Sequence, residues 1–110
     1  MRIIPYFESP DFEATRSFYT GVLGLREGNF GGDHIGFADG QAQVVFGRAG
    51  TAQASMGVDL GSVEAVDAAH AEALQRGHEI VYGPVTEPWG VYRFFVRDPG
   101  GTVVSVLAHA

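Results

Sequence analysis

The stretch PWGVYRFFVRDPGGTVVSV, residues 88–106, decides the fold. Its apolar residues predict two strands, at residues 92–97 and 102–108, on either side of the turn Asp98-Pro99-Gly100-Gly101. The preceding loop carries Trp89, which we expect to contact a ligand or a second subunit. Pairing the strands across the turn sets Val96 opposite Val103, Phe94 opposite Ser105 and Tyr92 opposite Leu107, with all of these on one side of the hairpin.

The first half of the chain predicts one strand, one helix and then three more strands. Ser9 is the expected N-cap of the helix, because Pro10 suits a first turn and Asp11 favours the positive end of the helix. Asp39-Gly40 is a strong signal for a tight hairpin turn. The strands are expected at residues 2–8, 26–30, 34–38 and 41–47.

The second half repeats this order of elements. Ser62 is the expected N-cap of a helix over residues 63–76, which Gly77 ends. Strands at residues 55–60 and 78–85 flank that helix, and the final hairpin follows. The sequence therefore predicts an α+β protein that is one domain, residues 1–110, made of two repeated modules, residues 1–50 and 51–110.

Composition limits the class of partner. The chain has 110 residues, with 7 Lys and Arg against 13 Asp and Glu, a net charge of -6. No basic stripe is present to bind phosphates, so we expect no nucleic-acid partner. The sequence contains no cysteine, and it shows neither a leader nor a membrane-spanning segment. We therefore expect a cytoplasmic protein without a membrane partner.

The segment DFEATRSFYTGVLGL, residues 11–25, resembles the first-helix signature of the vicinal oxygen chelate superfamily. That superfamily includes glyoxalase I, fosfomycin-resistance proteins, extradiol dioxygenases and bleomycin-resistance proteins. The resemblance rests on Asp11, the pair Phe18-Tyr19 and the run Leu23-Gly24-Leu25, together with the RDPGGTVVSV ending. It implies the glyoxalase/bleomycin resistance fold, in which two tandem βαβββ modules form a cup-shaped, mostly antiparallel sheet with the helices outside.

The positions where the resemblance places metal ligands hold other residues. They are Ile4, Ser55, Ser105 and one residue among 43–46, a segment without acid or histidine. A divalent cation in such a site needs histidine nitrogen or carboxylate oxygen. We therefore predict a protein without a metal or any other cofactor.

Aromatic and small polar residues are expected to line the site instead, and such a surface suits a flat or conjugated ligand. Glu8 and Asp59, together with the negative net charge, favour a cationic ligand. The candidate ligand-binding residues are Tyr6, Glu8, Phe30, His34, Ser55, Asp59, Trp89, Tyr92, Phe94 and Ser105.

Within the superfamily, the resemblance is closest to the metal-free bleomycin-resistance type. It implies a homodimer that sequesters an aromatic or hydrophobic antibiotic and so confers self-resistance. The alternative is a metal-independent lyase, isomerase or cyclase that acts through His34 with Glu8 or Asp59. A metal-dependent activity and a purely structural or regulatory role are the remaining hypotheses.

Overall fold

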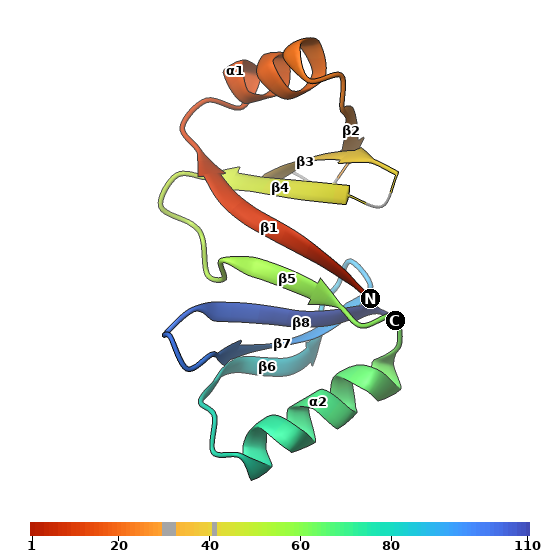
Figure 1. Ribbon diagram of the computed structural model, residues 1–110, viewed down its shortest axis with the longest axis vertical. Coiled ribbons are helices and arrows are strands. Elements are labelled where there is room, and N and C mark those ends of the chain that lie inside the picture. Colours follow the sequence, from red (N-terminus) through yellow and green to blue (C-terminus); the bar gives the residue numbers. More distant parts are fainter. Residues whose placement is uncertain (30–32, 41) are drawn as a thin grey trace. The chain divides into compact units, whose positions relative to one another are not determined.

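The computed structural model describes residues 1–29, 33–40 and 42–110. The chain divides into two compact units, an N-terminal unit, Ile4–Gln53, and a C-terminal unit in which Met1–Ile3 joins Ala54–Ala110. In each half of the chain a strand and a helical segment precede three more strands (Figure 1). The predicted α+β fold with a repeated βαβββ order is therefore confirmed. In the described part of the chain, no helix has the length and apolarity that crossing a membrane requires.

The N-terminal unit contains a sheet in which β4 lies between β3 and β1. Strand β1 runs parallel to β4, whereas β2 and β3, and β3 and β4, are antiparallel. A short α-helix continues directly into a π-helical segment, η1. The elements are β1 Arg2–Ser9, whose first two residues belong to the C-terminal unit, α1 Phe12–Arg16, η1 Ser17–Val22, β2 Arg26–Asn29, β3 His34–Asp39 and β4 Ala42–Arg48.

The N-cap of α1 is Asp11, so the expectation for Ser9 is wrong. The Asp11 carboxylate accepts a hydrogen bond from the Ala14 backbone N–H at 3.2 Å. The hydroxyl of Ser9 instead accepts from the Asp11 N–H, also at 3.2 Å. Pro10 precedes the cap and lies outside the helix, which begins at Phe12.

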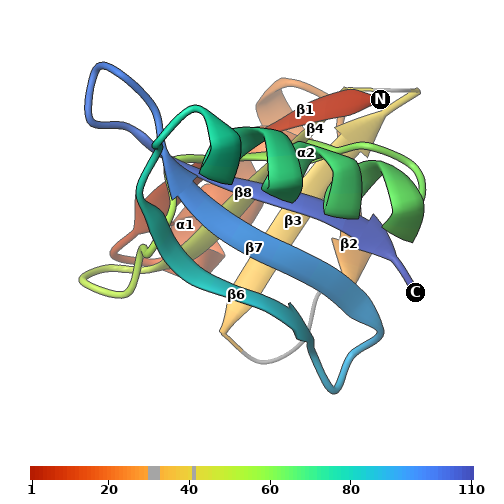
Figure 2. The ribbon, with the colours of Figure 1, turned by 90° about the horizontal axis from the view of Figure 1, so that it is seen from below.

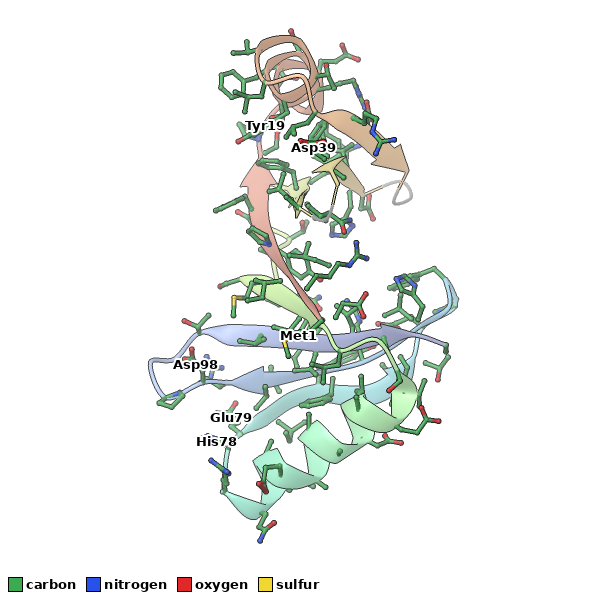
Figure 3. All side chains as sticks on the ribbon, turned by 45° about the vertical axis from the view of Figure 1, so that its right-hand side comes forward. Met1, Tyr19, Asp39, His78, Glu79 and Asp98 are labelled. Atoms are coloured by element: carbon green, nitrogen blue, oxygen red, sulfur yellow. The ribbon has the colours of Figure 1, made fainter. Side chains whose placement is uncertain are left out.

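Aromatic side chains form the core of the N-terminal unit. The ring of Tyr19, from η1, lies 5.4 Å from the Phe37 ring and 5.0 Å from the Phe46 ring, and Figure 3 shows it between the helical segment and the strands. Ile35 and Val44 pack in the same cluster. Along β3 and β4, every second residue therefore faces the helical segment.

The C-terminal unit repeats the topology. Its sheet has the order β5-β8-β7-β6, with β5 parallel to β8, and α2 lies across one face of it (Figure 2). Ser62 caps α2 as predicted, since its hydroxyl accepts from the Ala65 N–H at 3.2 Å. The elements are β5 Met56–Asp59, α2 Val63–Gln75, β6 Ile80–Thr86, β7 Val91–Arg97 and β8 Val103–His109.

The register of the last hairpin differs from the prediction by one residue. Arg97, not Val96, lies opposite Val103. The cause is the turn: Asp98 pairs with Thr102 through a 2.8 Å backbone hydrogen bond, which leaves a loop of Pro99, Gly100 and Gly101. The Asp98 carboxylate holds this loop by accepting from the N–H groups of Gly100 at 2.9 Å and Thr102 at 2.8 Å.

The corrected register reverses the side of the sheet on which two candidate site residues lie. Phe94 is opposite Val106, is 1% exposed, and belongs to the core against α2 with Val66. The hydroxyl of Tyr92 bonds the Asp67 carboxylate of α2 at 2.5 Å. The expectation that Tyr92 and Phe94 share the side of Ser105 is therefore wrong, because side chains alternate along a strand.

Gly83 in β6 is predicted to be intolerant of a side chain. It has a φ of +76°, and a Cβ there would lie 2.7 Å from the backbone oxygen of Arg93. Gly77, which ends α2, has a φ of +80° and nothing within 4 Å of a Cβ. We expect Gly77→Ala to lower the free energy of unfolding by about 1 kcal/mol and Gly83→Ala by about 3 kcal/mol, since overpacking adds to the backbone penalty.

Urea denaturation of the two glycine variants measures this difference. Equal losses in Gly83→Ala and Gly77→Ala would contradict the close approach of β6 to β7 at Gly83.

Candidate functional site

The side of the C-terminal sheet opposite α2 carries the candidate site, and we call it the Arg93 face. Its residues lie in register across the strands, because Phe95 of β7 is opposite Ser105 of β8, which in turn is opposite Gly57 of β5. Two neighbouring rows define the face: Gly57, Ser105, Phe95 and Tyr82 form one, and Asp59, Leu107, Arg93 and Val85 form the other.

A partly buried ion pair joins Arg93 of this face to Glu87, the residue that follows β6. The Nε of Arg93 donates to Oε2 of Glu87 at 2.7 Å, and the Nη2 approaches the same oxygen at 2.5 Å. The Tyr82 hydroxyl donates to the two carboxylate oxygens at 3.2 and 3.1 Å. Glu87 is only 8% exposed, so its charge depends on these partners.

Aromatic rings surround the Arg93 guanidinium. Its central carbon lies 4.7 Å from the Phe95 ring centroid, 5.4 Å from that of Trp89 and 5.7 Å from that of Tyr82. Each distance is within cation–π range, where a ring attracts a guanidinium by about 0.5–2 kcal/mol. Carboxylate and rings together fix the Arg93 side chain in one position.

Trp89 is presented by a loop of the same kind as the Asp98 turn. Glu87 N–H donates to Val91 oxygen at 2.7 Å and Gly90 N–H to Glu87 oxygen at 3.0 Å, which leaves Pro88, Trp89 and Gly90 as the loop. Gly90 has a φ of +86°, the left-handed conformation that such three-residue hairpin loops need. Trp89 therefore sits on a fixed turn and is 65% exposed.

Ser105 carries a polar group that the described protein does not satisfy. The residue is 0% exposed, and its hydroxyl has no hydrogen-bond partner among the described residues. In the N-terminal unit, Oε1 of Gln43 is in the same condition. A buried polar atom without a partner costs about 1–3 kcal/mol.

The residues at the expected metal-ligand positions do not fit a divalent cation. Ile4 is a buried aliphatic side chain, Ser55 is exposed, and Ser105 and Gln43 offer only a neutral hydroxyl and a neutral amide oxygen. No group of three or more His, Cys, Asp or Glu side chains suited to a metal ion occurs within residues 1–29, 33–40 and 42–110. The donor set thus lacks the imidazole and carboxylate ligands that such a cation requires.

The two candidate acids are occupied by contacts inside their own units. The Glu8 carboxylate accepts from the Ala52 N–H at 2.8 Å, and this bond, with others from the same loop, holds the pKa of Glu8 below its ordinary value. Asp59 accepts from the Gly61 N–H at 2.9 Å and pairs with Arg2 at 3.4 Å. Both acids therefore stabilise local structure.

The other candidates of the N-terminal unit lie mostly on the side of its sheet opposite the helix. Tyr6 is half-buried and opposite Val45. Glu8 and His34 both lie opposite Gly47, on β1 and β3, so the structure brings these two into one row. Phe30 lies outside the described residues.

Sequence reasoning missed Tyr82, Glu87, Arg93 and Phe95. The signal that could have found them is a pattern that occurs twice: an acidic residue, then Pro, any residue and Gly. It occurs as EPWG at residues 87–90 and as DPGG at residues 98–101. Reading both as three-residue loops places Arg93 and Phe95 on the side of Ser105.

The repeated topology defines a class: α+β proteins built from tandem βαβββ modules. Residues 8–106 match the Glyoxalase/Bleomycin resistance protein/Dioxygenase superfamily. The chain belongs to this superfamily. No curated protein matches it in sequence.

Solved structures share the fold at low sequence identity. An NAD-dependent benzaldehyde dehydrogenase from Legionella pneumophila is 16% identical, with a TM-score of 0.77 over 99% of this chain and 100% of its own. A hypothetical protein from Bacillus halodurans is 12% identical, with a TM-score of 0.78 over 97% of this chain and 92% of its own. The Mn(II)-bound glyoxalase from Novosphingobium aromaticivorans is 18% identical, with a TM-score of 0.73 over 97% of this chain but only 36% of its own. These similarities show the fold alone.

The buried ion pair is predicted to stabilise the C-terminal unit. Glu87→Gln removes the charge that the Arg93 guanidinium bonds, and we expect the free energy of unfolding to fall by about 2 kcal/mol. The matched control is Glu79→Gln, because Glu79 pairs with Arg97 at 3.4 Å on the exposed surface. That change is expected to cost less than about 0.5 kcal/mol.

Urea denaturation at neutral pH compares the two glutamine variants. A loss in Glu87→Gln no larger than in Glu79→Gln would contradict the assignment of Glu87 and Arg93 as a structural pair.

Proposed function

We propose that this protein binds an aromatic or hydrophobic small molecule without a metal and sequesters it. The observation that carries the proposal is the exposed indole of Trp89, held beside a fixed guanidinium and the rings of Tyr82 and Phe95. A planar ligand stacked on that indole gains about 0.5–1.5 kcal/mol per ring contact beyond the area it buries.

The chemistry of the same face supports a binding role. The Ser105 hydroxyl offers a hydrogen bond that no described residue uses. The superfamily's metal-ligand positions hold residues that cannot activate an oxygen or polarise a carbonyl through a cation. The proposed ligand is an antibiotic or related natural product, sequestration confers self-resistance, and the protein acts as a homodimer in the cytoplasm.

The alternative is a metal-independent lyase, isomerase or cyclase that acts on a natural-product intermediate. It draws support from the row that Glu8 and His34 share across Gly47. Glu8, however, gives its carboxylate to the Ala52 N–H. A carboxylate held in that way is a weaker candidate for a base that must meet a substrate.

Removing the indole is predicted to weaken ligand binding. Because the chain has one tryptophan, quenching of its fluorescence by planar aromatic antibiotics identifies a ligand directly. For that ligand we expect Trp89→Ala to cost about 1–3 kcal/mol of binding free energy, measured by calorimetry. The control is Phe18→Ala, which removes a ring that is 48% exposed on η1. Equal effects of both variants would contradict the assigned site.

Sequestration and catalysis are separated by recovering the ligand. Mass spectrometry after prolonged incubation is expected to return the intact ligand in stoichiometric amounts. Formation of a product that depends on His34 or Glu8 would establish the enzyme hypothesis instead.

A further inference from the structure

We infer that the ligand of the Arg93 face is an aromatic anion, and that Arg93 binds its carboxylate while Trp89 stacks on its ring. This inference rests on the proposed ligand-binding function and narrows the chemical class of the ligand. It reverses the expectation, drawn from Glu8, Asp59 and the net charge of -6, that the ligand is a cation.

The two acids that favoured a cationic ligand already have partners within the protein. The Glu8 carboxylate bonds the backbone of its own unit, and Asp59 is bonded by Gly61 and paired with Arg2. The imidazole of His109 also lies 3.9 Å from the Asp59 carboxylate. A cationic ligand would have to compete with these partners for each carboxylate.

The Arg93 guanidinium, in contrast, has hydrogen-bond donors that its contacts with Glu87 do not use. Its contacts with Glu87 use Nε and Nη2 and converge on one carboxylate oxygen, Oε2. Within the described residues, Nη1 of Arg93 donates to no acceptor. Since the guanidinium has five N–H donors in a planar fork, its free edge suits the two oxygens of a carboxylate.

The exposure of Arg93 and its distance from Trp89 make the free edge of the guanidinium accessible to a ligand. The Arg93 side chain is 21% exposed, and the adjoining Trp89 is 65% exposed. Their centres lie 5.4 Å apart, so one aromatic ring that bears a carboxylate can reach both. Glu87 already neutralises the guanidinium, so the carboxylate of the ligand binds through the N–H donors that Glu87 leaves free.

The test compares ligands that differ only in charge. Naphthalene carboxylate and naphthalene carboxamide are titrated by calorimetry at neutral pH into the wild type, Glu87→Gln, the double variant Glu87→Gln/Arg93→Gln, and Arg97→Gln. Arg93 is replaced in the Glu87→Gln background because replacing Arg93 alone would leave the buried Glu87 carboxylate without its partner. The single variant Glu87→Gln keeps the Arg93 charge and is the reference for the double variant. Arg97 is the matched control, since it is an arginine of the same strand that pairs with Glu79.

We expect the wild type and Arg97→Gln to bind the carboxylate at least about tenfold more tightly than the carboxamide, the effect of one charge-assisted hydrogen bond. Glu87→Gln, in which Arg93 keeps its charge but loses the carboxylate that positions it, is expected to keep a preference of the same sign. In the double variant the preference is expected to disappear. Equal binding of both ligands by the wild type would overturn the anion inference and leave aromatic binding standing. A preference that persists in the double variant would overturn the role of Arg93, and binding of neither ligand would overturn the proposed function itself.

Discussion

The hydrogen-bond register of β7 against β8 determines which side chains the C-terminal unit packs against α2 and which it places on the Arg93 face. Because side chains alternate along a strand, a shift of one residue would exchange the two sets. Asp98 fixes the register, since its carboxylate holds the N–H groups of Gly100 and Thr102. The core residue Phe94 and the site residue Arg93 therefore both depend on one turn.

The sequence was sufficient for the element order, the α+β class, the Ser62 cap and the superfamily, because those depend on local signals and on a repeated pattern. It was insufficient for the site, because the pattern of apolar residues does not distinguish a three-residue from a four-residue loop between β7 and β8. That choice put Phe94 on the wrong side of the sheet and hid Arg93. The ion pair between Arg93 and Glu87 joins residues on either side of the β6–β7 loop, so it depends on a second hairpin.

The chain shares its fold with part of a Mn(II)-bound glyoxalase. At the position expected to bear a metal-binding carboxylate, Ser105 offers a buried hydroxyl without a partner. In the neighbouring row of the same face, aromatic rings surround the Arg93 guanidinium, which Glu87 holds in place. Because a fold alone does not determine a function, the proposed function rests on the side chains of this face.

The central claim is that this superfamily member works without the metal that its fold accommodates elsewhere. The most direct measurement is elemental analysis of protein expressed in medium supplemented with zinc, manganese and iron, after gel filtration. The account predicts clearly substoichiometric metal, and an affinity for aromatic ligands that a chelator leaves unchanged, because Ser55, Ser105 and Gln43 supply only neutral oxygens. One retained metal ion per chain, with ligand binding abolished by the chelator and restored by that metal, would contradict it.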